Sequence, residues 1–343
     1  MKCSVVILNW NGKQWLSKFL PILIERTTLP DCEIVVADNG STDDSVDYLQ
    51  HEFPTVRLIC FDKNYGFAEG YNRAIDCIES EYVVLLNSDV EVAPHWLEPL
   101  IEFADSHSNV AAVQPKILSW HRHEDKIHNP ALPDIFEHAG AAGGYIDALG
   151  YPFCRGRIMS YVAEDHAQYD TPAKVLWTSG ACMLCRTAIY KKEGGLDAEF
   201  FAHMEEIDLC WRLNCRDYEL WCEPRSVVWH VGGGALNYEH PQKTFLNFRN
   251  SLLTLYKNLP TSRLWWVMLS RFLLDYVAAL NFLLHGKTGN AWAIARARMA
   301  YHKIAPNYSH TRTTNLKKVK VAYPQGIISR SIVFDYYLKR QRE

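Results

Sequence analysis

The sequence predicts an α/β protein with a mostly parallel sheet that helices cover on both faces. In the first third of the chain, short apolar runs rich in β-branched residues alternate with segments of helical apolar spacing. Right-handed β-α-β connections then place helices on both faces of one sheet. The 343 residues are 48% apolar and 22% charged, as in an ordinary globular protein, which excludes a disordered or low-complexity chain.

Four strand–helix units follow one another in this first third. We expect strands at residues 4–8, 33–37, 56–61 and 82–86. A helix over residues 14–25 follows the first strand. Ser41 and Asp44 resemble a capping box that begins the second helix. The third helix carries its inward-facing side chains at helical spacing, namely Tyr71, Ala74, Ile75 and Ile78.

The middle of the chain is less regular. Residues 119–172 are rich in His, Pro and Gly, and we expect a long solvated loop there. The loop contains three neighbouring histidines, for which a metal site is the alternative interpretation: His121, His123 and His128. A strand-like stretch at 175–186 follows it, and residues 187–193 then lead to a break at Gly194-Gly195.

The ten cysteines are expected to be reduced thiols. The apolar run after Met1 is too short for a signal peptide, which favours a cytoplasmic protein. Cys182 and Cys185 form a lone CxxC with no second pair at zinc spacing. Buried structural thiols are therefore favoured over a metal or redox role.

Polar turns follow two of the predicted strands. Asp38 begins the turn after the second strand, and the Asn87-Ser88-Asp89 turn follows the fourth. In parallel α/β sheets, ligands bind at the carboxyl ends of the strands. Both turns are therefore candidate binding segments.

Two later segments offer acid–base chemistry. Glu205, Glu206 and Asp208 begin a helix, where they either complement the helix dipole, with Asp208 paired to Arg212, or hold a general base. His230 ends an apolar strand and precedes three glycines, which allow a ligand to approach closely. A buried core histidine is the alternative interpretation.

Seven stretches, in this order, resemble family 2 glycosyltransferases of the inverting GT-A type, especially the bacterial rhamnosyltransferase-like branch. They lie between about residues 3 and 258, at 5–11, 35–43, 64–72, 85–89, 180–183, 200–212 and 229–233. Each stretch alone is a weak signal, but all seven in order are specific. The resemblance implies a GT-A nucleotide-sugar-binding and catalytic domain over residues 1–240, followed by a helical basic region over 241–343.

The same resemblance implies the residues that bind the donor. Asn9 and Asn11 would lie in the first nucleotide-binding loop, and Asp38 would bind the pyrimidine base. Asn72 would contact the phosphates or the sugar of the donor. Asn87 and Gly180 would complete the substrate-binding set.

A divalent metal is also implied. Asn87-Ser88-Asp89 matches the DxD-type motif of the family, with Asn in its first position. Asp89 and His230 would hold Mg²⁺ or Mn²⁺ against the two phosphates, because diphosphate oxygens suit hard cations.

The acidic helix matches the motif that carries the catalytic base. The family usually has Asp where Glu206 stands, so Glu206 is the first choice for the base and Asp208 the second, with Glu205 as an orienting group. The base would take the proton of an acceptor hydroxyl as that oxygen attacks the anomeric carbon. One displacement opposite the nucleoside diphosphate would invert that centre.

The charge is unevenly distributed. Residues 1–240 carry 19 basic and 36 acidic side chains, whereas residues 241–343 carry 17 basic and 3 acidic ones. Within the basic part, 17 of the 21 residues at 264–284 are apolar, and Arg271 and Asp275 can pair at i,i+4. We expect a helix that lies on an anionic membrane surface. An oligomer interface and a membrane span are the alternatives, and the absence of a recognised motif argues against nucleic acid.

The sequence thus predicts an inverting glycosyltransferase of polysaccharide biosynthesis. It would move a sugar from a nucleoside-diphosphate donor to a hydroxyl of a glycan or lipid-linked acceptor, at the inner face of the cell membrane. The departures at Asn87 and Glu206 leave open a catalytically weak protein that only binds nucleotide-sugar or glycan. A dinucleotide dehydrogenase is disfavoured, because Asn9-Trp10-Asn11-Gly12 replaces GxGxxG after the first strand.

Overall fold

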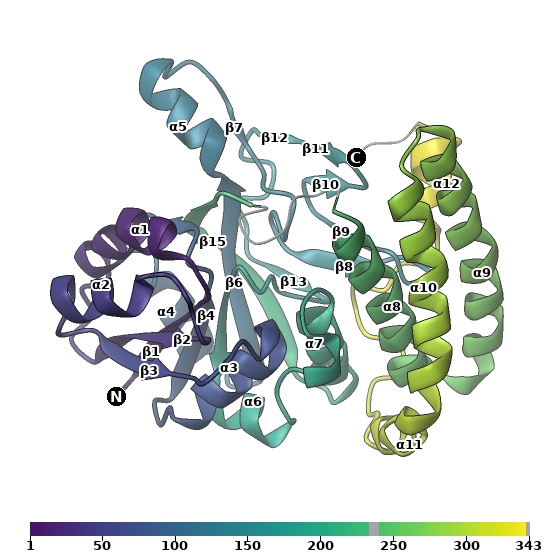
Figure 1. Ribbon diagram of the computed structural model, residues 1–343, viewed down its shortest axis with the longest axis horizontal. Helices are drawn as coiled ribbons and strands as arrows, with labels where there is room; N and C mark the ends of the chain where they lie inside the picture. Colours follow the sequence, from purple (N-terminus) through teal and green to yellow (C-terminus); the bar gives the residue numbers. More distant parts are fainter. Residues whose placement is uncertain (233–239, 341–343) are drawn as a thin grey trace.

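The computed structural model describes residues 1–232 and 240–340. Figure 1 shows a central sheet with helices on its faces and, beside it, a group of long helices from the C-terminal part of the chain.

The central sheet has nine described strands in the order β13-β15-β6-β14-β4-β1-β2-β3, with β5 paired to β15. Their bounds are β1 Cys3–Asn9, β2 Cys32–Asp38, β3 Arg57–Cys60, β4 Tyr82–Leu86, β5 Val90–Val92, β6 Val110–Ser119, β13 Ala173–Val175, β14 Cys182–Arg186 and β15 Glu219–His230. The β3-β2-β1-β4 half is parallel, as predicted. β14 runs antiparallel to both β4 and β6, and β15 runs parallel to β6.

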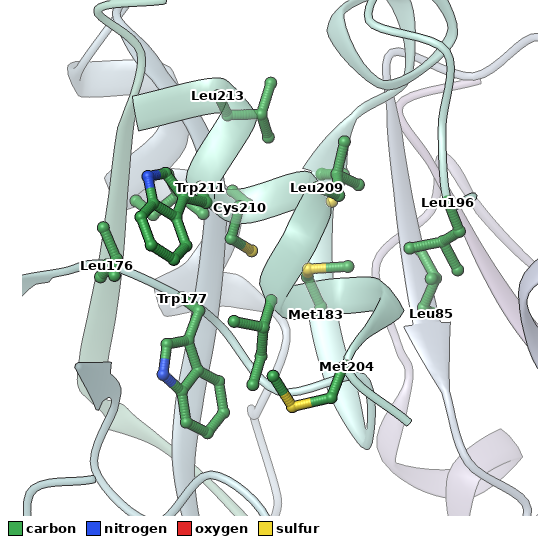
Figure 2. Close-up of a cluster of buried hydrophobic side chains, with 14 of the residues drawn as sticks. Leu85, Leu176, Trp177, Met183, Leu196, Met204, Leu209, Cys210, Trp211 and Leu213 are labelled. Atoms are coloured by element: carbon green, nitrogen blue, oxygen red, sulfur yellow. The ribbon is translucent and has the colours of Figure 1, made fainter. Parts of the chain in front are cut away.

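Helices cover both faces of this sheet. One buried cluster joins the sheet to α1, α2 and α4, and the other joins it to α3, α6 and α7. Their bounds are α1 Lys13–Arg26, α2 Ser45–Glu52, α3 Gly66–Asp76, α4 Glu98–Ser106, α6 Thr187–Lys192 and α7 Glu205–Cys215. Figure 2 shows part of the second cluster, in which Leu209 of α7 lies near Met183 of β14, while Trp211 of α7 lies on the side of Leu176. The apolar side of α7 therefore fixes that helix to the sheet.

The predicted capping box at Ser41 is wrong. Helix α2 begins at Ser45, and no side chain caps it at Asp44. The Ser41 hydroxyl donates instead to Oδ1 of Asp38, at 2.6 Å. A nearby carboxylate outcompetes the helix terminus for this hydroxyl, because hydrogen bonds to a charged acceptor are the stronger ones.

The long loop predicted over residues 119–172 is also corrected. Its first part is a helix, α5 Trp120–His128, and short strands follow at β7 Asp134–Ile135, β8 Gly144–Ile146, β9 Pro152–Cys154, β10 Arg157–Ile158, β11 Tyr161–Val162 and β12 Glu164–Asp165. Although the sequence of α5 is polar, two aromatic contacts hold this helix against the rest of the protein. The buried Trp120 packs edge-on against Phe19, and His123 stacks on Trp229 with ring centroids 3.9 Å apart.

The remaining expectations for this region have mixed outcomes. The stretch at 175–186 is not one strand, because a loop separates β13 from β14. Cys182 and Cys185 are buried in β14, and the ten cysteines are free thiols in the described structure. No group of three His, Cys, Asp or Glu side chains within residues 1–232 and 240–340 is arranged to hold a metal.

Five helices and a short 3-10 turn form the C-terminal part, in which α10 packs between α8 and α9. They are α8 Pro241–Asn258, α9 Thr261–Leu284, α10 Thr288–Ile304, η2 Ala305–Tyr308, α11 Ser309–Lys317 and α12 Ile332–Tyr337. Helix α8 also packs against α7, whereas α9 lies at the outer edge of the molecule (Figure 1).

Candidate active site

The loops after β1 and β2 meet at the carboxyl edge of the sheet. Asn9 is fully buried, and its Nδ2 donates to Oδ1 of Asp38 at 2.9 Å. The carboxylate of Asp38 also accepts the backbone N–H and the hydroxyl of Ser41, at 2.9 and 2.6 Å. The structure thus brings the predicted Asn9 and Asp38 into direct contact, and Asp38 orders its own loop.

Asn11 joins the same two loops from the other side. Its Oδ1 accepts the backbone N–H of Thr42 at 2.7 Å, and its own N–H donates to the Ser41 hydroxyl at 2.9 Å. Gly12 follows, and a Cβ there would lie 2.4 Å from Oδ1 of Asn9. Within the loop after β1, a side chain at position 12 would therefore clash with the buried amide of Asn9.

The end of β15 meets the turn after β4. Nε2 of His230 lies 3.2 Å from Oδ1 of Asp89, and Nδ1 lies 3.3 Å from Oε2 of Glu137. All three side chains are buried. The Asn87 amide nitrogen is 3.4 Å from Nε2 of His230. The predicted metal pair and Asn87 thus share one place, to which the structure adds Glu137.

This cluster strongly favours positive charge. Burial alone would lower the pKa of His230, but the carboxylates of Asp89 and Glu137 outweigh burial and raise the pKa to about 10. Burial opposes ionisation of Glu137 as well, yet His230 lowers the pKa of that carboxyl to about 2. The two carboxylates therefore flank the imidazole of His230 and favour its protonated form, so a metal ligated by Nε2 would take the place of that proton.

The donor atoms of Asp89 and His230 fit a divalent cation. Neighbouring ligands of an octahedral cation, each about 2.1 Å from it, stand about 3 Å apart, and Oδ1 of Asp89 and Nε2 of His230 are 3.2 Å apart. One carboxylate and one imidazole leave most coordination positions to other ligands. The donor set therefore suits a metal that is shared with the oxygens of a bound diphosphate.

Residues 179–181 connect this cluster to the start of α7. The backbone N–H of Asn87 donates to the carbonyl of Ala181 at 3.0 Å. A Cβ built on Gly180 would lie 3.9 Å from Cβ of Glu206 and 3.2 Å from the Phe67 ring. Gly180 therefore lies between the predicted donor site and the predicted base.

The turn before α7 has an unusual backbone. Phe201, His203 and Met204 have φ of +62°, +69° and +74°, in the left-handed region that few non-glycine residues adopt. Asn250 of α8, itself fully buried, holds this turn. Its Nδ2 lies 2.7–3.0 Å from the carbonyl oxygens of Phe200, Ala202 and His203. Such a conformation persists only when its surroundings fix it.

Glu206 stands just after this turn, in the first turn of α7. Its Oε2 is buried, and no partner for it exists among the described residues. Burial raises the pKa of Glu206 to about 7, although nearby backbone N–H groups oppose the rise. Burial and the charge of Glu206 raise the pKa of Glu205 well above its ordinary value. Burial thus favours the neutral form of both carboxyls, and the pKa of Glu206 lies near neutral pH.

Asp208 has a different environment. Its side chain is fully buried and accepts from Arg212, Lys257 and Asn258 at 3.0, 2.7 and 2.8 Å. Burial would raise the pKa of Asp208, but the two cations outweigh it and lower the pKa. Both carboxylate oxygens are thus engaged in joining α7 to α8.

Asn72 also serves the protein interior. Its Nδ2 donates to the Leu196 carbonyl at 2.7 Å, while its Oδ1 accepts from the Tyr190 hydroxyl at 2.8 Å and from the Leu196 N–H at 3.0 Å. These bonds hold the turn at residues 190–196, and they use the amide that was expected to contact the donor.

Three residues of the site escaped sequence reasoning. Glu137 lies in the segment predicted to be a solvated loop. Asn250 and Lys257 lie in the region that the sequence predicts only as helical and basic. Each acts across more than 40 positions of sequence. A buried polar residue at helical spacing within an apolar stripe, as at Asn250, is the signal that was available.

Comparison with known proteins points to the same family. Residues 4–170 match the family model of glycosyl transferase family 2. The N-acetylglucosaminyl-diphospho-decaprenol L-rhamnosyltransferase of Mycobacterium tuberculosis is 28% identical over 240 residues, which cover 66% of this chain and 75% of that protein. The chain is thus similar to family 2 glycosyltransferases and to a rhamnosyltransferase, in agreement with the sequence motifs.

Solved structures confirm the GT-A fold. GalNAc-T7 with UDP, GalNAc and Mn²⁺ has a TM-score of 0.56 at 16% identity, over 75% of this chain but only 48% of that one. The mannosyltransferase of Pyrobaculum calidifontis in complex with GDP-Man and Mn²⁺ has a TM-score of 0.52 at 14% identity, over 92% and 84%. The family match and the fold together support glycosyl transfer from a nucleotide sugar.

The support that Asn250 gives to the turn before α7 leads to the first prediction. In the Asn250→Asp variant, a carboxylate faces three carbonyl oxygens, so we expect a loss of about 1–3 kcal/mol of unfolding free energy. We also expect a large fall in kcat and little change in the KM for the donor, because the turn positions Glu206 and does not position the donor loops. Urea unfolding and steady-state hydrolysis of the nucleotide sugar measure these effects.

Asn281→Asp, at an exposed position of α9, is the matched control for the change of residue type. An Asn250→Asp enzyme with unchanged kcat would contradict the positioning role.

Proposed function

We propose that this chain is an inverting, metal-assisted glycosyltransferase that transfers a sugar to a hydroxyl of a lipid-linked or glycan acceptor. The observation that carries the proposal is Glu206, whose unpartnered carboxylate oxygen is buried beside Gly180 and whose pKa lies near neutrality. A carboxylate of this kind is suited to general-base catalysis at pH 7. The name of the mycobacterial relative supports a deoxyhexose donor and a diphospholipid-linked acceptor.

The donor is proposed to lie along the carboxyl edge of the sheet. Asn9, Asn11 and Asp38 form one hydrogen-bonded unit there, which we expect to face the nucleoside. Asn87 and Gly180 would border the diphosphate and the sugar. Because these segments are held by each other, the pocket needs little reorganisation when the donor binds, which conserves binding free energy.

Asp89 and His230 would hold Mg²⁺ or Mn²⁺ together with the diphosphate. When bound, the metal would neutralise charge on the leaving phosphates. Glu137, on the other side of His230, keeps that imidazole oriented and adds negative charge beside the site. Asn87 in the first position of the motif supplies no charge, so the protein contributes one carboxylate ligand.

Glu206 would act on the acceptor. The acceptor hydroxyl loses its proton to the Glu206 carboxylate while its oxygen bonds to the anomeric carbon, and the bond from that carbon to the diphosphate oxygen breaks on the opposite side. The raised pKa makes Glu206 a stronger base than an ordinary carboxylate. Burial and the charge of Glu206 raise the pKa of the neighbouring Glu205. Asp208 would anchor the helix rather than serve as the base.

We also propose the division of labour along the chain. Residues 1–240 would bind the donor and carry out the chemistry, and residues 241–343 would form a basic helical region at the inner face of the cell membrane. Helix α8 lies in the basic helical region but also serves the catalytic region, because its Asn250 and Lys257 support the segment that presents Glu206.

Removing the base defines the second prediction. Glu206→Gln keeps the size of the side chain but cannot accept the proton, so we expect kcat to fall about 10²–10⁴-fold with donor affinity retained. Glu205→Gln is the matched control, because an amide mimics a protonated carboxyl, and it should remain within severalfold of the native rate. Sugar transfer or donor hydrolysis, measured with both variants, provides the test. Equal losses in the two variants would refute the assignment, and a native chain that binds donor without turnover would favour the binding-only protein.

The pKa of Glu206 gives the third prediction. The base works only when it is deprotonated, so kcat/KM should rise about tenfold per pH unit below pH 7 and level off above about pH 7. The Glu206→Asp variant should shift the midpoint of this rise in kcat/KM, because the shorter side chain places the carboxylate in different buried surroundings. A pH–rate profile that is flat between pH 5 and 8 would contradict a base with the pKa of about 7 given for Glu206.

Nucleotide binding is the fourth prediction. We expect one pyrimidine nucleotide among UDP, dTDP and CMP to raise the melting temperature, GDP to do so less, and Mn²⁺ to increase the shift. Asp89→Ala should abolish the contribution of the metal, whereas Asp76→Ala at an exposed helix end should not. Differential scanning fluorimetry measures each shift. Stabilisation that is the same with and without metal would contradict the role of Asp89.

A further inference from the structure

Helix α9 turns its polar side inward and its apolar side outward. Its buried residues recur every four positions at Val267, Arg271, Asp275 and Ala279. The opposite face exposes ten large apolar side chains, namely Trp265, Trp266, Leu269, Phe272, Leu273, Tyr276, Val277, Leu280, Leu283 and Leu284. This is the reverse of a surface helix in a soluble protein, whose apolar stripe faces the core.

A buried charge network fixes this orientation. Arg271 Nε lies 3.2 Å from Oδ1 of Asp275, and Arg298 of α10 donates to Oδ2 of Asp275 at 2.6 Å. Arg271 also reaches the Ser251 hydroxyl of α8 at 2.6 Å. Rotating α9 to bury its apolar face would leave these charges without partners, which is strongly unfavourable. The apolar face must therefore be covered from outside.

The extent of this face indicates a partner. A helix of 24 residues is about 36 Å long, and the exposed side chains run from Trp265 to Leu284 along nearly all of it. Soluble monomers rarely expose a continuous apolar patch of this kind. Figure 1 shows α9 at the outer edge of the molecule, where a flat partner can reach it.

The surrounding charge selects the partner. Residues 261–340 carry 13 basic and 2 acidic side chains. Both acids and three of the basic side chains are buried, which leaves ten basic side chains partly or fully exposed and no exposed acid. The neighbouring helix α10 exposes a stripe that alternates large apolar and basic side chains: Trp292, Arg296, Met299 and Lys303. A second copy of the chain would bring like charges together, whereas anionic lipid headgroups complement them.

The aromatic residues agree with a lipid partner. Trp265, Trp266 and Tyr276 present both an apolar ring and a polar atom, as side chains at membrane–water interfaces commonly do. By length and hydropathy alone, α9 is the one described helix that could cross a membrane. A spanning α9 would have to withdraw Arg271 and Asp275 from α8 and α10, so an interfacial position is favoured.

We propose that the outer face of α9, together with the exposed stripe of α10, docks the protein onto an anionic lipid bilayer. Helix α9 lies along the bilayer surface, its apolar side chains enter the headgroup–acyl boundary, and its Arg271–Asp275 side remains bound to α8 and α10. This docking follows from the surface itself. Its use, which is to hold the active site near a lipid-linked acceptor, rests on the proposed function.

Vesicle co-sedimentation of the full chain tests the docking. Vesicles of phosphatidylcholine with phosphatidylglycerol should bind the protein more strongly than phosphatidylcholine alone, and high salt should weaken the binding. The variant Leu273→Ser/Val277→Ser should lower the partition coefficient at least about tenfold, because it removes two large side chains from the inserted face. Ile24→Ser/Ile127→Ser changes two exposed apolar residues outside α9 and should bind like the native chain.

Two outcomes would overturn the proposal. One is equal vesicle binding by the α9 variant and the control variant. The other is a dimer, found by sedimentation velocity without vesicles, that the α9 variant dissociates, which would assign the face to a second copy. Donor hydrolysis is measured on the same variants and should be unchanged. If the native chain does not hydrolyse the donor, the proposed chemistry is contradicted. If the native chain does not bind vesicles, the docking is contradicted. The two failures can therefore be told apart.

Discussion

The buried carboxylate of Asp208 holds the two parts of the molecule together. It accepts hydrogen bonds from Arg212 on its own helix and from Lys257 and Asn258 on α8. Removing one member of such a cluster leaves a buried charge without a partner, which strongly destabilises the α7–α8 contact. The position of Glu206, of the turn before it and of the long C-terminal helices all depend on this contact.

Strain in the turn before α7 has the same origin. Three left-handed residues in four positions would not persist in an isolated loop, but Asn250 binds their carbonyl oxygens from α8. The C-terminal helices are therefore part of the active-site scaffold. Helix α8 links the two regions for which we propose functions, because its Asn250 holds the turn before Glu206 and its Ser251 contacts Arg271 of α9.

Buried polar groups have two opposite uses in this protein. Asp208 and Asp275 are neutralised by nearby cations and serve as anchors between helices. Glu206 instead retains an unpartnered oxygen, and the carboxylates of Asp89 and Glu137 flank the imidazole of His230. Because burial makes an incomplete polar group costly, the second kind of site is where a substrate or a cation is expected to complete the structure.

The sequence by itself determined the parallel half of the sheet, the helices that follow it, and the order of the motifs at its carboxyl edge, because these follow from local periodicity and from short segments. It also determined the Arg271–Asp275 pair, which lies within one helical turn. Tertiary structure alone decided that α5 is a helix, that Ser41 serves Asp38, and that Asn72 and Asp208 hold neighbouring segments. Contacts between distant residues made these choices, since a polar side chain takes the strongest partner that folding brings within reach.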